Sequence, residues 1–86
     1  GLLPGARGDL ADQMRRAALS VYANLSEGEG KRAPAERRRL FEIAWGSLRE
    51  LESVLHLAST LGLIPPARLP TLRSTCRHVG RMLHPL

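Results

Sequence analysis

A strongly patterned helical segment, with two polar residues close to its end, occupies Arg15-Arg16-Ala17-Ala18-Leu19-Ser20-Val21-Tyr22-Ala23-Asn24-Leu25-Ser26-Glu27-Gly28. Upstream of it, Asp9 is a good N-cap, because its carboxylate can accept a hydrogen bond from a backbone N–H of the first turn. Gly28 is suited to end the helix in the left-handed conformation. The pattern predicts a helix over residues 9–27, followed by a short mobile turn. Apolar residues recur every three or four positions and share one face of this helix: Leu10, Met14, Ala17, Val21 and Leu25.

A second, longer helix is predicted over residues 34–61. Pro34 suits its first position, where the missing N–H costs nothing, and Gly62 is expected to terminate it. At 1.5 Å per residue the second helix would be roughly 42 Å long and the first roughly 28 Å, so the first could not cover all of it. Its apolar arc spans well over half of the circumference, wider than the ~100° stripe of a helix with one buried face. The centre of the arc consists of Leu40, Ala44, Leu48, Leu51, Val54, Leu55 and Ala58, and Phe41, Trp45 and Leu57 lie beside it, where we expect contacts between subunits.

A third helix is predicted over residues 67–84, after the stiff Pro65-Pro66 pair. Pro70 favours a late start, because a proline inside a helix removes a backbone hydrogen bond. Short connections make successive helices antiparallel neighbours. The chain is therefore expected to form one all-α domain over residues 1–86, an antiparallel up-down helical bundle. Apolar residues of the third helix recur in a coiled-coil-like seam: Leu69, Leu72, Cys76, Val79 and Leu83.

The size and composition of the chain indicate self-association. A domain of 86 residues buries only ~60–65% of its unfolded surface, and domains this small usually need a disulfide, a metal or a partner subunit. The single cysteine, Cys76, cannot form an internal disulfide, and no cluster of Cys and His offers a zinc site. No apolar run approaches the ~20 residues of a membrane span, and the start lacks the features of a secretory signal. We therefore expect a cytoplasmic homo-oligomer without metal or cofactor.

No arrangement of residues in the sequence indicates catalysis. Gly28-Glu29-Gly30-Lys31 lacks the glycine spacing of a phosphate-binding loop and follows a helix rather than a strand. His56, His78 and His84 do not have the spacing of metal ligands. The serines have no neighbouring His–acid pair that could activate them. We therefore expect that the chain is not an enzyme.

Asn24 and Glu27 are the polar residues for which we expect a structural role. Asn24 falls at the edge of the apolar face, where an unpaired amide would cost ~1–3 kcal/mol. We expect its amide to be hydrogen-bonded near the turn between the first two helices, in preference to contacting a ligand. Glu27 is expected to assist the same turn or to pair with Arg32. Together with Gly28, these residues form the predicted structural motif.

The net charge of +5 is unevenly distributed, and two basic clusters result. Arg73, Arg77 and Arg81 lie one helical turn apart, and no acid follows Glu52. On the second helix, by contrast, the sequence predicts intrahelical pairs of Arg38 and Arg39 with Glu42 and of Arg49 with Glu52. The second cluster lies around the first turn of the chain and consists of Lys31, Arg32, Arg37 and Arg38.

Both clusters are candidates for contacting phosphates of RNA or DNA. Few aromatic residues accompany them, so base stacking has little support, and phosphate contact without much sequence readout is the more natural mode. The alternative is that the arginines only match acids, either Glu50 and Glu52 or acids of another subunit. In that case the protein would be a structural or protein-interaction scaffold that binds no nucleic acid.

The motif Arg-Arg-Ala-Ala-x-Ser-x-x-Ala-Asn-x-x-Glu-Gly over residues 15–28 resembles the core motif of the four-helix-bundle proteins encoded in intervening sequences of 23S rRNA genes. The resemblance continues in residues 44–52, where such proteins carry a similar Gly-Ser-Leu stretch, and in residues 79–83. These proteins have a further helix before the segment that matches residues 9–27. Residues 1–8 are expected to form a loop instead, so the first helix of the bundle would be lost or absent from this chain.

The resemblance also implies function. It implies a homopentamer with a basic surface suited to nucleic acid. It further implies a relation to the accessory variability proteins of diversity-generating retroelements, which bind a reverse transcriptase and nucleic acid. The expected function is therefore that of a non-enzymatic, homo-oligomeric accessory protein that contacts phosphates through basic helix faces.

Overall fold

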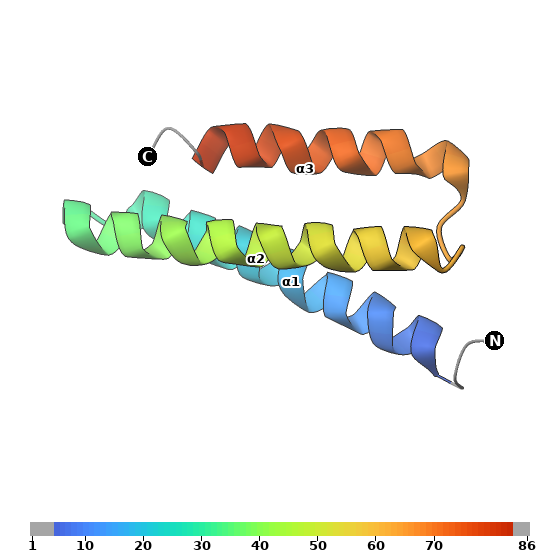
Figure 1. The fold of residues 1–86 in the computed structure, drawn as a ribbon. Helices are drawn as coiled ribbons and strands as arrows, with labels where there is room; N and C mark the ends of the chain where they lie inside the picture. The colour runs from blue at the N-terminus through green and yellow to red at the C-terminus, as the bar shows by residue number, and fades with distance from the viewer. Residues whose placement is uncertain (1–4, 84–86) are drawn as a thin grey trace.

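Three α-helices and one short 3-10 turn make up the computed structural model, which describes residues 5–83 (Figure 1). The helices α1, α2 and α3 run successively antiparallel, and in the view of Figure 1 α1 crosses behind α2. No strand occurs within the described residues. The expectation of an all-α chain with three helices is therefore confirmed. The elements are α1, Ala6–Gly30; α2, Pro34–Thr60; η1, Pro66–Arg68; and α3, Leu69–Leu83.

The helix α1 is longer at both ends than its sequence predicts. It is preceded by Gly5 in the left-handed conformation (φ 85°), and Asp9 lies in its first turn, with its backbone N–H donating to the Gly5 carbonyl at 2.9 Å. Asp9 is therefore not the N-cap, although its negative charge still faces the positive end of the helix dipole. Gly28 is not the terminator either, because the helix continues to Gly30 and Lys31 caps it in an extended conformation (φ −88°, ψ 137°).

Gly28 has a packing role instead of a conformational one. It is buried in the last turn of α1, directly against the ring of Phe41 on α2. A Cβ atom at position 28 would lie 2.6 Å from Phe41 Cε1 and 2.8 Å from Phe41 Cδ1. Only a residue without a side chain permits this approach of the two helices.

The helix α2 supplies most of the core. Its buried residues include nearly all of the predicted centre of its apolar arc, and Gly62 ends it with a positive φ of 73°, as expected. The expected length mismatch with α1 is wrong: 25 and 27 residues correspond to about 38 Å and 40 Å at 1.5 Å per residue. Phe41, which the sequence analysis places at a subunit contact, is instead covered within the single chain, where it is 7% exposed.

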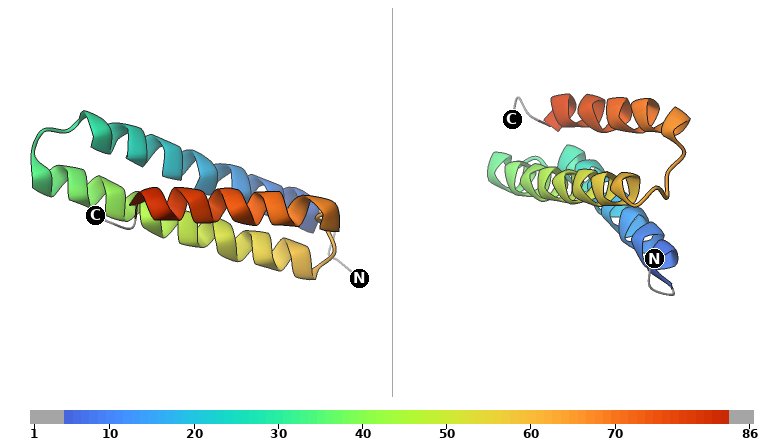
Figure 2. Two further views of the ribbon diagram at one scale, coloured as in Figure 1. Left: turned by 90° about the horizontal axis from the view of Figure 1, so that it is seen from above. Right: turned by 45° about the vertical axis from the view of Figure 1, so that its right-hand side comes forward.

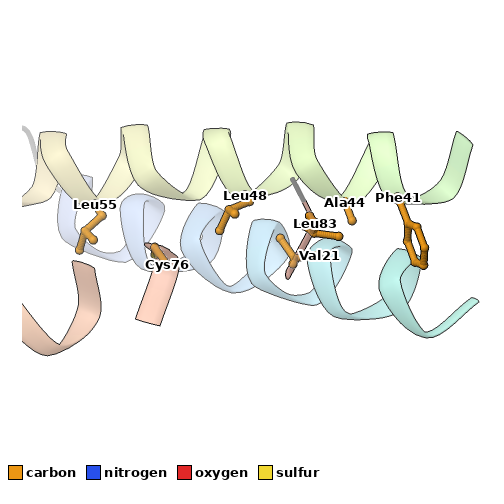
Figure 3. Packing of buried hydrophobic residues seen from close by; sticks show 7 residues of the cluster. All are labelled: Val21, Phe41, Ala44, Leu48, Leu55, Cys76 and Leu83. Carbon is orange, nitrogen blue, oxygen red and sulfur yellow. The ribbon is translucent and has the colours of Figure 1, made fainter. Parts of the chain in front are cut away.

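Two apolar clusters hold the helices together. The larger cluster joins all three helices, with side chains that point into the space between them (Figure 3). The smaller cluster lies where α1 begins and α2 ends. There, Met14, Leu63 and Ile64 pack around Leu10, Val54 and Ala58. The larger cluster consists of Val21 from α1; Phe41, Ala44, Leu48 and Leu55 from α2; and Cys76 and Leu83 from α3.

The helix α3 packs less extensively than the α1–α2 pair does. Seen from above, it runs along the seam between α1 and α2 (Figure 2), and its contacts are mainly with α2. Of its predicted seam, Cys76 and Leu83 are buried, whereas Leu72 is exposed. Clefts therefore remain on both sides of α3.

The chain as a whole is elongated and exposes much surface. It measures 49 × 24 × 13 Å, with a radius of gyration of 14.5 Å, whereas a compact domain of this length would have one of about 12 Å. Its accessible surface is 6206 Å², against about 5,000 Å² for a compact monomer of this mass. Some of the apolar surface that a closed core would bury is thus open to solvent.

Candidate nucleic-acid interface

The arginine stripe of α3 consists of Arg73, Arg77 and Arg81. The burial of Cys76 and Leu83 against α2 fixes the rotation of α3, and this rotation leaves all three arginines exposed. They follow one another at about 6 Å along the helix axis. Within residues 5–83 the one ion pair joins Arg15 to Asp12, so none of the three guanidinium groups has a carboxylate within 4 Å.

The arginine stripe borders a cleft between α2 and α3, which we call the α2–α3 cleft. Its main part has a volume of about 670 Å³. A second hollow of about 390 Å³ shares four of its lining residues and extends it to Leu55 and Arg73. From α2 the main part is lined by Trp45, Leu48, Arg49, Glu52, Ser53 and His56, and from α3 by Cys76, Arg77, Gly80 and Arg81.

The electrostatics of the α2–α3 cleft are dominated by cations. Glu52 is the acidic residue in its lining, where the arginine stripe is joined by Arg49. Burial, and secondarily the negative charge of Glu52, raises the pKa of the Cys76 thiol above its ordinary value. The thiol is therefore protonated at neutral pH, and Cys76 acts as a small apolar core residue rather than as a nucleophile.

The acids that could neutralise the arginine stripe within one chain do not pair with it. Glu50 is exposed on α2 and Glu52 is half-buried, yet neither lies within 4 Å of an arginine, since the ion pair found in the described chain lies on α1. The predicted pairs of Arg38 and Arg39 with Glu42 and of Arg49 with Glu52 are not formed, since the ion pair of the described residues joins Arg15 to Asp12.

The second basic cluster lies at the connection between α1 and α2, the end toward which α3 runs (Figure 1). All four of its side chains are exposed. The Arg37 guanidinium lies 5.7 Å from the centroid of the Phe41 ring, a distance typical of a cation–π contact. Arg37 therefore covers part of a core aromatic residue, while Lys31, Arg32 and Arg38 project from the connection.

The predicted structural motif is arranged differently from expectation. The Asn24 amide is hydrogen-bonded, but it donates to the Ser20 carbonyl at 2.8 Å and to Ser20 Oγ at 3.3 Å. Both acceptors lie one turn back in α1, so the amide does not fix the turn into α2. Glu27 is exposed and does not pair with Arg32. Gly28, Glu29 and Gly30 belong to the last turn of α1, not to a mobile loop.

A hydroxyl pair joins α1 and α2 where the sequence analysis identified no contact. Ser20 Oγ and Ser47 Oγ lie 2.6 Å apart in a partly buried position, and the Asn24 amide adds a second bond to the same Ser20 hydroxyl. These residues form a short polar network across the otherwise apolar helix pair. Ser47 follows Gly46, and these two consecutive small residues are the sequence feature that indicates a close approach of the two helices.

The α2 wall of the cleft also escaped the sequence analysis. Its residues Trp45, Arg49, Glu52 and His56 recur at spacings of four, three and four, which is one helix face. From the sequence, Arg49 and Glu52 are predicted to form an intrahelical ion pair and Trp45 to make a subunit contact. The position of α3 decides which face of α2 borders the cleft. In the sequence, only the helical spacing of these four residues indicates that they share a face.

The three expected subunit contacts have different environments. Phe41 is in the core of the chain, Trp45 is half-buried and lines the α2–α3 cleft, and Leu57 is 46% exposed. The largest exposures among the apolar residues are on α1, at Leu19 (65%) and Tyr22 (71%). Other large exposed apolar residues of the described chain are Ile43 on α2, Leu61 directly after α2, and Leu72 and Met82 on α3.

The described residues contain no cluster of three or more Cys, His, Asp or Glu that could hold a metal ion. His84 lies outside them. None of the helices described is long and apolar enough to cross a membrane.

A family model described as 23S rRNA-intervening sequence protein matches residues 5–85, nearly the whole chain. No curated protein and no solved structure matches the chain.

Proposed function

Because this chain belongs to the 23S rRNA-intervening sequence protein family, we propose that it is a non-enzymatic, homo-oligomeric accessory protein that binds nucleic acid through phosphate contacts. The oligomer is a pentamer that acts in the cytoplasm. The observation that carries the proposal is the arginine stripe of α3, whose three guanidinium groups are exposed and have no carboxylate within 4 Å in the described chain.

Phosphates are the partners that this arrangement suits. Three guanidinium groups spaced about one helical turn apart can each donate to a phosphate oxygen, and such contacts position a nucleic acid without reading its sequence. The cluster at the α1–α2 connection adds Lys31, Arg32 and Arg38. An oligomer repeats both clusters in every subunit, so modest contacts add up to avidity.

Self-association is supported by the apolar surface of the single chain. Leu19 and Tyr22 on α1, Leu57 on α2 and Met82 on α3 are all about half exposed or more. The accessible surface of 6206 Å² exceeds that of a compact monomer by about 1,000 Å², a part of which an interface would cover.

The same exposed apolar residues favour a second candidate function, that of a scaffold that binds only proteins. In this case the arginine stripe would pair with acids of a neighbouring subunit. A reverse transcriptase is the protein partner that the resemblance to retroelement accessory proteins suggests, and it is compatible with either function.

A gel-shift titration with generic RNA and DNA, run beside size-exclusion chromatography, tests the proposal. The triple variant Arg73→Gln, Arg77→Gln, Arg81→Gln should lose most of the binding and keep the elution volume of the parent. The matched control removes three exposed arginines of α1, at positions 7, 15 and 16, and should bind almost as the parent does. Loss of the oligomer in the first variant, or no shift at low salt for the parent, would support the scaffold instead.

A further inference from the structure

We propose that the α2–α3 cleft takes one unpaired nucleotide of a single-stranded nucleic acid, with the base against the Trp45 wall and the phosphates on Arg77 and Arg81. This inference rests on the proposed function and names the form of nucleic acid that the site prefers. The volume of about 670 Å³ lies within the range of pockets that enclose small ligands.

The apolar half of the cleft fits a nucleobase. Trp45 and Leu48 from α2 and Gly80 from α3 line it. A Cβ atom at position 80 would lie in ordinary contact with Trp45 Cζ3 and Leu48 Cδ2, each at 3.5 Å, so Gly80 leaves room for about one methyl group beside the Trp45 ring. One aromatic wall is enough for one base, because every base has a π-face and stacking tolerates any sequence.

The cationic half of the cleft fits the backbone of the same nucleotide. Arg77 and Arg81 follow each other on α3 and Arg49 faces them from α2. Three guanidinium groups against the single carboxylate of Glu52 leave a net positive charge. A ligand that carries a flat apolar group beside a phosphate satisfies both halves at once, whereas a phosphate alone would leave the apolar half in contact with water.

The requirement for an unpaired base follows from the position of the apolar half between two helices. A paired base is stacked on both faces and must leave the duplex before it can enter such a pocket. A single strand has no such barrier. The extension of the cleft to Arg73 provides a further cation along the same wall for the next phosphate. Duplexes can still contact the exposed arginines, but without filling the cleft.

The chain offers a direct reporter, because Trp45 is its only tryptophan. We would titrate the full chain with a single-stranded oligoadenylate, a hairpin duplex of matched length, adenosine monophosphate and inorganic phosphate. Tryptophan emission reports on the cleft, and the anisotropy of labelled nucleic acid reports on binding anywhere. The single strand should quench Trp45, the duplex should bind without quenching, and inorganic phosphate should have no effect on emission.

Matched variants separate the cleft from the general basic surface. Gly80→Leu should fill the apolar half and weaken single-strand binding roughly 5- to 150-fold, the range that loss of one stacked base produces. Gly80→Ala adds only a methyl group at ordinary contact distance and serves as its control. Trp45→Leu should weaken single-strand binding more than Trp45→Phe does, and duplex binding should be unchanged in all four variants. Circular dichroism verifies that each variant is folded.

The outcomes distinguish this inference from the proposed function. Binding by anisotropy without any change in Trp45 emission would overturn the inference and leave the proposed function intact. Equal quenching by the duplex would overturn the requirement for an unpaired base. Adenosine monophosphate that binds as tightly as the oligonucleotide would make the cleft a free-nucleotide site and overturn the single-strand assignment. Absence of binding to any nucleic acid would overturn the proposed function itself.

Discussion

Replacing Gly28 with alanine should destabilise the protein, although alanine is the better helix former. Gly28 lies inside α1, and a Cβ atom there would come within 2.6 Å of Phe41 Cε1 and 3.3 Å of Phe41 Cζ. The ring cannot easily move away, because it is buried in the core and the Arg37 guanidinium lies 5.7 Å from its centroid. The added methyl group must therefore push the two helices apart or force the ring from its rotamer.

The magnitude follows from two opposed effects. Overpacking a core by a methyl group costs about 1–3 kcal/mol, whereas the change from glycine to alanine in a helix contributes about 1 kcal/mol of stability. The net loss should therefore be about 0–2 kcal/mol. Gly46→Ala and Gly8→Ala provide the propensity effect alone, since no atom lies within 4 Å of a Cβ at either position. The difference between Gly28→Ala and these controls should be about 1–3 kcal/mol.

Urea unfolding followed by circular dichroism at one protein concentration measures this difference. A fixed concentration is needed because the stability of an oligomer depends on it. In a Phe41→Leu background the cost of Gly28→Ala should fall, since the clashing ring atoms are gone, and a double-mutant cycle gives the coupling. If Gly28→Ala stabilises as much as Gly46→Ala does, the close approach of α1 to Phe41 is not as described.

Three further predictions concern the helix contacts and the surface. Ser20→Ala or Ser47→Ala alone should lower the free energy of unfolding in urea by about 1 kcal/mol, because each removes the hydrogen bond between the two hydroxyls. The double variant should lose less than the sum of the two single losses, and additive losses would exclude the bond. Burial and then the negative charge of Glu52 raise the pKa of the Cys76 thiol above its ordinary value. Its contribution to stability is therefore complete below the unfolded-state pKa and is lost as the pH rises through the folded-state pKa. Cys76→Ala should remove this alkaline loss, and an identical pH profile would contradict the assignment. Leu57→Glu should lower the mass in light scattering without loss of helicity, and an unchanged mass would place Leu57 outside the subunit contacts.

The sequence pattern predicts the helices and the centre of the core well, because apolar periodicity reports directly on which face of a helix is buried. Leu40, Ala44, Leu48, Leu55 and Ala58 are all buried, as the periodicity of α2 indicates. The terminator Gly62 was also predictable, since a glycine after the last apolar position commonly takes a positive φ.

Features that depend on the distance between helices were not predictable in this way. A glycine near the end of a helix looks the same in the sequence whether it ends the helix or makes room for an aromatic ring of the next helix. Gly28 makes room for the ring of Phe41. Phe41 was assigned to a subunit contact for the same reason, because the close approach that covers it is a tertiary effect. The α2–α3 cleft depends on where α3 lies, so the shared wall of Trp45 and Arg81 could not be seen in either helix alone.

The central claim is that the arginine stripe of α3 contacts phosphates, and the salt dependence of binding tests it most directly. The measurement is the affinity for a labelled single strand as a function of salt concentration, for the parent chain and for the variant with glutamine at positions 73, 77 and 81. Each lost phosphate contact reduces the slope of log Kobs against log salt by about 0.7 for a single strand, so three contacts should reduce it by about 2. A parallel light-scattering measurement should give the same mass for both proteins. A slope and affinity equal to those of the parent chain would contradict the claim.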